Sequence, residues 1–241
     1  MSQKPDSLRL LAFGAHPDDI EFGCGAVVAQ ATRAGASAHF VICTRGEAAS
    51  NGSAEEREAE TMRAAGLLGA TVQFVDMGGD AHLEATPANA LVLAALIRRV
   101  RPHVVLAPTL VSNQHPDHAV VGSLARDAAR LARYGGLAEL REQEPHAVTQ
   151  VLFYAVTAEG EPRDTTPLLV DVSEAGVMTA WRAAMEAHGT QAKTRNYVEL
   201  QLTRARLNGL RAGVEHAVAL FSGDPVVVSS VSALARGARR F

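Results

Sequence analysis

Short apolar runs alternate with longer amphipathic stretches through the first half of this 241-residue chain. We expect strands at residues 8–15, 38–44, 71–76 and 103–107, and helices between them at residues 25–34, 54–68 and 87–100. Because strands that alternate with helices pair in parallel through crossover connections, this order predicts a mostly parallel sheet with helices on both faces. The sequence therefore predicts a Rossmann-like, three-layer α/β fold.

The second half of the chain is less regular. Strands are expected at residues 150–156 and 168–172, and helices at residues 117–132, 173–188 and 201–221. No repeat, low-complexity tract or change in composition marks a linker, and single α/β domains of this length are common. We therefore expect residues 1–241 to form one domain.

Two clusters of polar residues follow two of the expected strands. Residues 14–19 (GAHPDD) end the first strand, and residues 115–118 (HPDH) lie between the strand at 103–107 and a helix. In an open α/β sheet, ligands bind in the crevice outside the carboxyl ends of the strands. Both clusters are therefore predicted to lie at the same edge of the sheet.

Three side chains in these clusters suit a metal ion. His16 and Asp19 are three residues apart on a turn, and His118 completes a set of two imidazoles and one carboxylate. Catalytic zinc usually has three protein ligands and an open position for water, although iron(II) favours the same triad. Such an ion lowers the pKa of a bound water to about 7, which makes hydroxide available at neutral pH. The sequence therefore predicts a catalytic metal site.

The remaining residues of the clusters supply acid and base groups. Asp18 is adjacent to a ligand on a tight turn, and it is the natural base beside a bound water. His115 is a candidate for polarising the substrate carbonyl or stabilising the oxyanion. Asp117 is expected to accept a hydrogen bond from that imidazole and to hold its tautomer, as carboxylates behind catalytic histidines do. Together these groups predict metal-assisted hydrolysis of an amide.

Each cluster also has a simpler interpretation when it is taken alone. Adjacent aspartates after a strand commonly cap a helix, and histidines in a first helical turn are often only surface groups. A structural zinc would need a fourth protein ligand, and neither cluster offers a convincing one. The dinucleotide pattern GxGxxG does not follow the first strand. Taken jointly the clusters favour a catalytic site, and a Rossmann-like binding protein with a structural metal is the alternative.

Composition excludes several other classes. The chain has 23 basic and 26 acidic residues, so no basic excess indicates nucleic acid. Cys24 and Cys43 are too few for a disulfide framework and are expected to be buried, free thiols. Residues 1–7 lack a signal-peptide pattern, and no run approaches the ~18 apolar residues of a membrane helix. We therefore expect a cytoplasmic protein with no membrane partner.

At these two clusters the chain resembles the PIG-L/LmbE-like zinc de-N-acetylases, which carry AHPDD and HPDH elements after the corresponding strands. The segment 44–47 (TRGE), the Asn51–Gly52 turn and the helix start at 56–58 resemble the bacterial branch that deacetylates N-acetylglucosaminyl-malate for bacillithiol. The resemblance implies zinc at His16, Asp19 and His118, Asp18 as general base and then acid, His115 as oxyanion stabiliser oriented by Asp117, and Arg57 reaching the substrate or the oxyanion.

The resemblance predicts a metal-dependent deacetylase that acts on an N-acetylglucosamine conjugate, and a homo-oligomer, in that branch a hexamer. The alternatives within the same chemistry are amidases that act on a thiol conjugate or on another N-acylated sugar. Without the resemblance, Arg57 has a simpler role as an ion-pair partner of glutamates on an exposed helix. Trp181 and Tyr197 are each either core residues or pocket residues, and His188 is expected at the surface or in core packing.

Overall fold

The computed structural model describes residues 7–113, 115–193, 195–234 and 237. In this part of the chain seven strands form one sheet, in the order β3-β2-β1-β4-β5-β7-β6. The strands are β1 (Arg9–Gly14), β2 (Ser37–Ile42), β3 (Ala70–Phe74), β4 (Val104–Pro108), β5 (Gln150–Tyr154), β6 (Leu168–Asp171) and β7 (Ala217–Ser222). Strands β1 to β5 are parallel, whereas β7 is antiparallel to β5 and to β6. The prediction of a mostly parallel α/β fold is confirmed.

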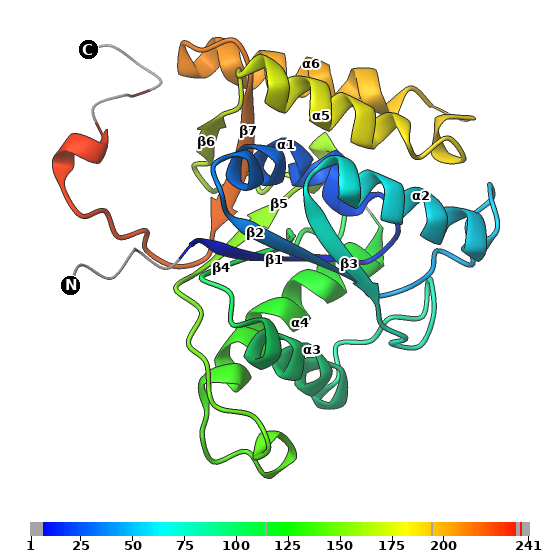
Figure 1. The fold of residues 1–241 in the computed structure, drawn as a ribbon, viewed down its shortest axis with the longest axis vertical. Coiled ribbons are helices and arrows are strands. Elements are labelled where there is room, and N and C mark those ends of the chain that lie inside the picture. The colour runs from blue at the N-terminus through cyan, green and yellow to red at the C-terminus, as the bar shows by residue number, and fades with distance from the viewer. Residues whose placement is uncertain (1–6, 114, 194, 235–236, 238–241) are drawn as a thin grey trace.

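Helices cover both faces of the sheet. Figure 1 shows α1, α2, α5 and α6 on one face and α3 and α4 on the other. Their bounds are α1 (Asp19–Arg33), α2 (Ala54–Leu67), α3 (Pro87–Val100), α4 (Pro116–Arg133), α5 (Ala175–Glu186) and α6 (Tyr197–Ala212). Short 3₁₀ turns are η1 (Ala138–Leu140), η2 (Ala158–Gly160), η3 (Gln191–Lys193) and η4 (Val231–Leu234). None of the described helices is both long enough and apolar enough to span a bilayer.

The alternation of side chains along β1 builds the two layers of core. Leu10 and Ala12 pack in the cluster under α1 and α5, whereas Leu11 and Phe13 pack in the cluster under α3 and α4. Successive side chains of a strand point to opposite faces, so a strand buried on both faces is apolar throughout. This explains why the strand could be recognised as a continuous apolar run.

Some of the expected elements differ from the observed ones. Helix α3 has the predicted bounds, and α2 ends one residue earlier than predicted. Helix α1 begins at Asp19 and not at residue 25, because the last residue of the first cluster already enters the helix. The prediction of a continuous helix over 201–221 was wrong. Helix α6 ends at Ala212, Gly213 follows at φ 70°, and residues 217–222 form the buried strand β7.

Two glycines allow α1 to lie close to the sheet and to α5. A Cβ atom on Gly23 would lie 2.1 Å from the ring of Tyr154, and one on Gly25 would lie 2.8 Å from the ring of Trp181. Both rings are fully buried, and the indole Nε1 of Trp181 donates to the carbonyl of Glu21. Trp181 is therefore a core residue that fixes the start of α1.

Candidate metal centre and active site

The two polar clusters meet at the topological switch point of the sheet, between β1 and β4. Strands β1 and β4 are neighbours, yet α1 follows β1 on one face and α4 follows β4 on the other (Figure 1). Such a point opens a crevice at the carboxyl ends of the strands. The crevice here is a cavity of about 510 Å³, lined by the two clusters and by residues of later elements, among them Phe22, Ser50, Asn51, Val156, Thr157, Gln191 and Tyr197.

The three predicted ligands converge in this crevice. His118 Nε2 lies 2.9 Å from Asp19 Oδ1 and 3.3 Å from His16 Nδ1, and His16 Nδ1 lies 3.7 Å from Asp19 Oδ2. Tetrahedral zinc with bonds of about 2.0–2.1 Å places its ligand atoms about 3.3 Å apart. The three observed separations, which involve both carboxylate oxygens of Asp19, lie around that value, and all three side chains are buried. The donor set and its spacing therefore fit a zinc ion.

Backbone groups fix the carboxylate of this set. Asp19 Oδ2 accepts hydrogen bonds from the backbone N–H groups of Ala15 at 2.8 Å and His16 at 3.0 Å. The hydroxyl of Thr44, at the end of β2, donates to the carbonyl of Ala15 at 2.8 Å. The turn that carries the ligands is therefore held by its own side chain and by the neighbouring strand.

A second group of potential ligands lies behind His16. Its Nε2 is 3.0 Å from Asp80 Oδ1 and 3.3 Å from Asp117 Oδ2, and His115 completes a group of four. A metal-binding imidazole usually donates its other N–H to a carboxylate, which fixes the tautomer. Asp80 and Asp117 are in that position, since they face Nε2 while Nδ1 faces Asp19 and His118. Asp80 was not predicted from the sequence, and Asp117 was predicted to lie behind His115, from whose Nδ1 its Oδ2 is 3.9 Å away.

The site carries an excess of negative charge. Burial lowers the pKa of the His16 imidazole, but contacts with Asp117, Asp19 and Asp80 outweigh it and raise that pKa well above its usual value. The only cation side chain that lines the cavity in the described residues, besides the histidines, is Arg57. An environment that favours positive charge on an imidazole also favours a bound cation.

Asp18 has a strained backbone conformation, and its side chain does not cap α1. It occupies the residue before α1 at φ 105°, and its side chain makes no capping hydrogen bond. Residues other than glycine seldom adopt this left-handed backbone conformation, so the surrounding structure has to hold the strained backbone in place. Burial and the neighbouring Asp19 raise the pKa of Asp18 to about 6, although Arg57, His188 and His16 act in the opposite direction.

Arg57 is buried, so its interpretation as an exposed ion-pair residue was wrong. The side chain projects from α2, where Ser53 and Glu56 form a capping box at the helix start. Its guanidinium donates to the carbonyls of Gly46 and Pro17, each at 2.9 Å, and lies 3.5 Å from Asp18 Oδ2. Arg57 therefore fixes the loop that carries Asp18.

His115 has a defined tautomer. The backbone N–H of Asp117 donates to its Nδ1 at 3.3 Å, so in the neutral ring the proton is on Nε2. Burial and the nearby His16 lower the pKa of His115 below its usual value, although Asp117 acts in the opposite direction. The ring centroids of His115 and His16 are 4.6 Å apart. The structure therefore places a neutral N–H donor beside the ligand set.

A buried pair behind Asp18 was not anticipated. His188 Nε2 lies 3.2 Å from Glu21 Oε1, and both side chains are almost completely buried. His188 was predicted to lie at the surface or in core packing. It is buried, but the prediction did not include its contact with Glu21.

The two cysteines are buried and free, as expected.

The comparisons with known proteins agree with this geometry. The family model described as PIG-L, GlcNAc-PI de-N-acetylase, matches residues 11–129, which include both clusters. The crystal structure of the conserved protein TT1542 from Thermus thermophilus is 35% identical, with a TM-score of 0.80, and the match covers 92% of this chain and 97% of that one. The chain belongs to the PIG-L family.

Two curated relatives have different activities. Diacetylchitobiose deacetylase from Thermococcus kodakarensis is 29% identical over 162 residues, which are 62% of this chain and 60% of that protein. The 4-oxalmesaconate hydratase from Pseudomonas putida is 33% identical over 138 residues, which are 52% of this chain and 53% of the hydratase. The chain thus matches between half and two thirds of the length of each of these relatives.

Proposed function

We propose that the protein is a metal-dependent deacetylase that hydrolyses the acetamido group of an N-acetylglucosamine conjugate. The observation that carries this proposal is the spacing of His16, Asp19 and His118, which suits one zinc ion, beside a carboxylate that is not a ligand. A zinc ion bound there would polarise the amide carbonyl and increase the acidity of water.

Asp18 is proposed as the general base and then the general acid. A base works best when its pKa is near the operating pH, and a pKa of about 6 keeps the Asp18 carboxylate ionised at neutral pH while leaving it able to return the proton. It takes a proton from the attacking water and gives it to the leaving amine, so the nitrogen departs as a neutral amine. Its position on the ligand turn keeps it beside the site of attack.

His115 is proposed to donate Nε2–H to the oxygen that becomes negative when the amide is attacked. This requires a neutral ring with the proton on Nε2, which is the state favoured by the contact with the backbone of Asp117. A donor that is already oriented costs no reorganisation as the charge develops. Asp117 itself is proposed to support His16, and Arg57 is proposed to act through Asp18.

The substrate class is proposed from the cavity and the family. A volume of about 510 Å³ accommodates one sugar ring with a small substituent, within the range of ligand pockets. The family description and the Thermococcus kodakarensis relative both name acetylated amino sugars. N-acetylglucosaminyl-malate, the substrate predicted from the bacillithiol-type segment 44–58, is our first candidate.

We also propose a homo-oligomer, with a hexamer as the expected form. After β7 the chain leaves the layers of the fold, and Figure 1 shows this segment projecting from the rest of the molecule. Its apolar side chains are exposed, including 89% of Val227 and 82% of Val231. Exposed apolar groups gathered on one segment are typical of contacts between chains. Sedimentation of the full chain at several concentrations tests this proposal.

The deciding experiment is an activity screen with zinc-loaded protein. N-acetylglucosamine, N-acetylglucosaminyl-malate and N,N′-diacetylchitobiose are assayed for release of acetate, with and without a chelator. We expect release of acetate that the chelator abolishes and added zinc restores. Because a family relative is a hydratase, 4-oxalmesaconate is included as a separate arm. Full activity without metal, or hydration with no amide cleavage, would overturn the proposal, and tight zinc binding without turnover of any compound would favour a structural metal.

A further inference from the structure

The segment between α5 and α6 contacts both α1 and α2. His188 contacts Glu21 of α1, as described above. The backbone N–H of Thr190 donates to Glu60 Oε1 of α2 at 2.9 Å, and the Thr190 hydroxyl donates to Glu60 Oε2 at 2.6 Å. Glu60 and Thr190 are both buried. This segment is therefore fixed to the same helix that carries Arg57.

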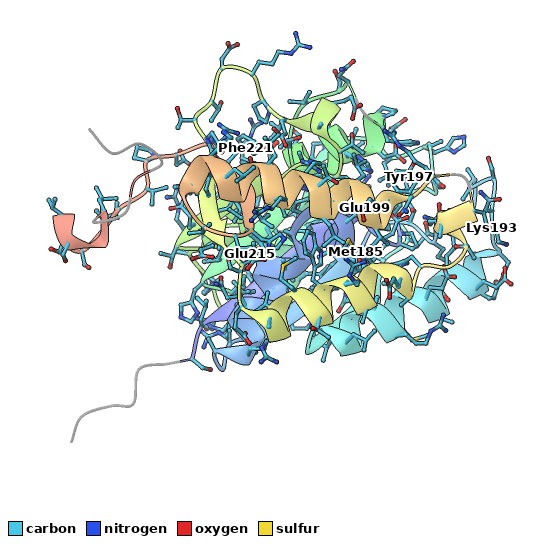
Figure 2. The ribbon with its side chains drawn as sticks, turned by 90° about the horizontal axis from the view of Figure 1, so that it is seen from above. Met185, Lys193, Tyr197, Glu199, Glu215 and Phe221 are labelled. Carbon is cyan, nitrogen blue, oxygen red and sulfur yellow. The ribbon has the colours of Figure 1, made fainter. Side chains whose placement is uncertain are left out.

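The next residue connects this segment to the rim of the cavity. Gln191 Nε2 donates to the Thr190 hydroxyl oxygen at 3.1 Å and to the carbonyl of Asn51 at 3.4 Å. The adjoining Gly52 has φ 80°, and a Cβ there would lie 2.6 Å from a methyl carbon of Thr190. The turn at Asn51 therefore packs directly on Thr190, and both Gln191 and Asn51 line the cavity. Figure 2 shows the start of α6 at Tyr197 beside this segment, with Lys193 farther out.

These contacts determine on which side of the Gln191 amide the NH₂ group and the Oε1 atom lie. The Thr190 hydroxyl proton is committed to the Glu60 carboxylate, so its oxygen can only accept from Gln191. The Asn51 carbonyl is likewise only an acceptor. Both partners therefore require the NH₂ group of Gln191. Its Oε1 has no hydrogen-bond partner among the residues that the structure describes, so the group left for a ligand is an acceptor.

The walls of the cavity indicate what this acceptor faces. Phe22, Val156 and Tyr197 provide an apolar and aromatic wall, whereas Ser50, Asn51 and Gln191 provide polar groups. The rings of Phe22 and Tyr197 have centroids 5.7 Å apart. A sugar ring combines an apolar C–H face with hydroxyl groups at its edge, which matches such a pair of walls.

We propose that Gln191 determines substrate specificity, by accepting a hydrogen bond at Oε1 from a hydroxyl group of the sugar, and that Glu60 and Thr190 are positioning residues that orient its amide. This inference rests on the proposed function. It predicts that the enzyme distinguishes a sugar hydroxyl from a hydrogen atom at one ring position, and that this distinction depends on Gln191.

The test compares N-acetylglucosamine with its 3-deoxy, 4-deoxy and 6-deoxy analogues on zinc-loaded protein. For the wild type we expect kcat/KM to fall roughly two- to tenfold for one analogue, as for loss of one neutral hydrogen bond. Gln191→Leu should lose activity on the parent sugar, mainly through KM, and should treat that analogue and the parent alike. Thr190→Val should weaken the preference, because the amide is then free to turn. Gln73→Leu, on edge strand β3, is the matched control and should behave as the wild type.

Each result decides the inference. Equal discrimination by wild type and Gln191→Leu, with equal zinc content, would overturn it, as would a wild type that discriminates against none of the analogues. If the wild type releases no acetate from any sugar, the proposed function fails, and the inference is then decided by calorimetric binding of the same four compounds. A binding preference that disappears in Gln191→Leu would support the inference without turnover, and its absence would overturn it.

Discussion

Replacing Arg57 should change the pH at which the enzyme becomes active. Its guanidinium lies 3.5 Å from Asp18 Oδ2. With an effective dielectric constant of about 20, two charges at that distance interact by about 4–5 kcal/mol, which equals roughly three pKa units. Water that enters the vacated space would screen much of this effect. We expect Arg57→Ala to raise the pKa of Asp18 by at least about one unit.

The sign of the effect on activity follows from the role of Asp18. Only the ionised carboxylate accepts a proton, so kcat/KM increases as the pH rises through the pKa of Asp18. Burial and Asp19 already raise that pKa to about 6, and a bound cation would lower it in every variant alike. Loss of the Arg57 charge therefore moves the acid limb of the pH profile to higher pH in Arg57→Ala than in the wild type.

The same substitution should destabilise the fold. It leaves the carbonyls of Gly46 and Pro17 without their donors. An unsatisfied buried polar group costs about 1–3 kcal/mol, so Tm should fall by roughly 5 °C or more. Arg57→Lys keeps the charge but cannot donate to both carbonyls as a fork, so it should lose stability with little shift of the limb. Arg45→Ala, at an exposed arginine paired with Glu55 and Glu58, is the matched control.

The assay is kcat/KM from about pH 4 to 9, a range that brackets the expected limb, together with thermal unfolding and metal analysis of each variant. An acid limb that coincides in wild type and Arg57→Ala would refute the reasoning. If KM alone rises while the limb stays in place, Arg57 contacts the substrate, as the family resemblance implies.

Three further outcomes are expected from changes at the metal centre. Asp18→Asn should retain zinc and lose about 10²–10⁴ in kcat, whereas Asp19→Asn should lose zinc; retention of normal turnover by Asp18→Asn would place the base elsewhere. His115→Ala should keep its metal and lose about 10²–10³ in rate, whereas His118→Ala should lose metal; equal zinc content with equal rates would contradict this division. Asp80→Asn should weaken zinc affinity about 10–100-fold in a chelator competition, and unchanged affinity would remove Asp80 from its supporting role.

The parts of the fold that the sequence predicted are those with a strong local pattern. Helix α3 was predicted at its observed bounds. In the structure Thr86 caps it, Pro87 begins it, and Arg101 ends it at φ 54°. Strand β7 was missed because residues 217–222 are apolar almost without interruption and closely follow a helix. A short apolar run of this kind has no period that separates a strand from a buried helix. Residues 217–222 form a strand because they pair antiparallel with β5 and β6.

The candidate site residues that lie in the two short clusters could be predicted from the sequence. His16 and His118 lie in clusters whose chemistry is visible in the sequence, and the parallel sheet brings the clusters together. Asp80 lies in a loop after β3, with no neighbouring motif, and reaches His16 only through the path of that loop. Glu21 and His188 are far apart in the sequence, so their pairing depends on how α5 packs against α1. Contacts of this kind have no local pattern.

The two halves of the chain contribute different parts of the site. The ligands and the base lie at the ends of β1 and β4, whose positions the parallel strands fix. The part of the cavity wall with Val156 and Tyr197 depends on the later elements, where Gln201 and Arg204 of α6 donate to the carbonyl of Val156 at 2.7 and 3.0 Å. A substitution in α6, or in the segment directly before it, is therefore expected to change this part of the cavity wall without moving a metal ligand. Substrate preference is expected to vary with residues such as Gln191 while the hydrolytic groups stay the same, which is how one fold supports related enzymes with different substrates.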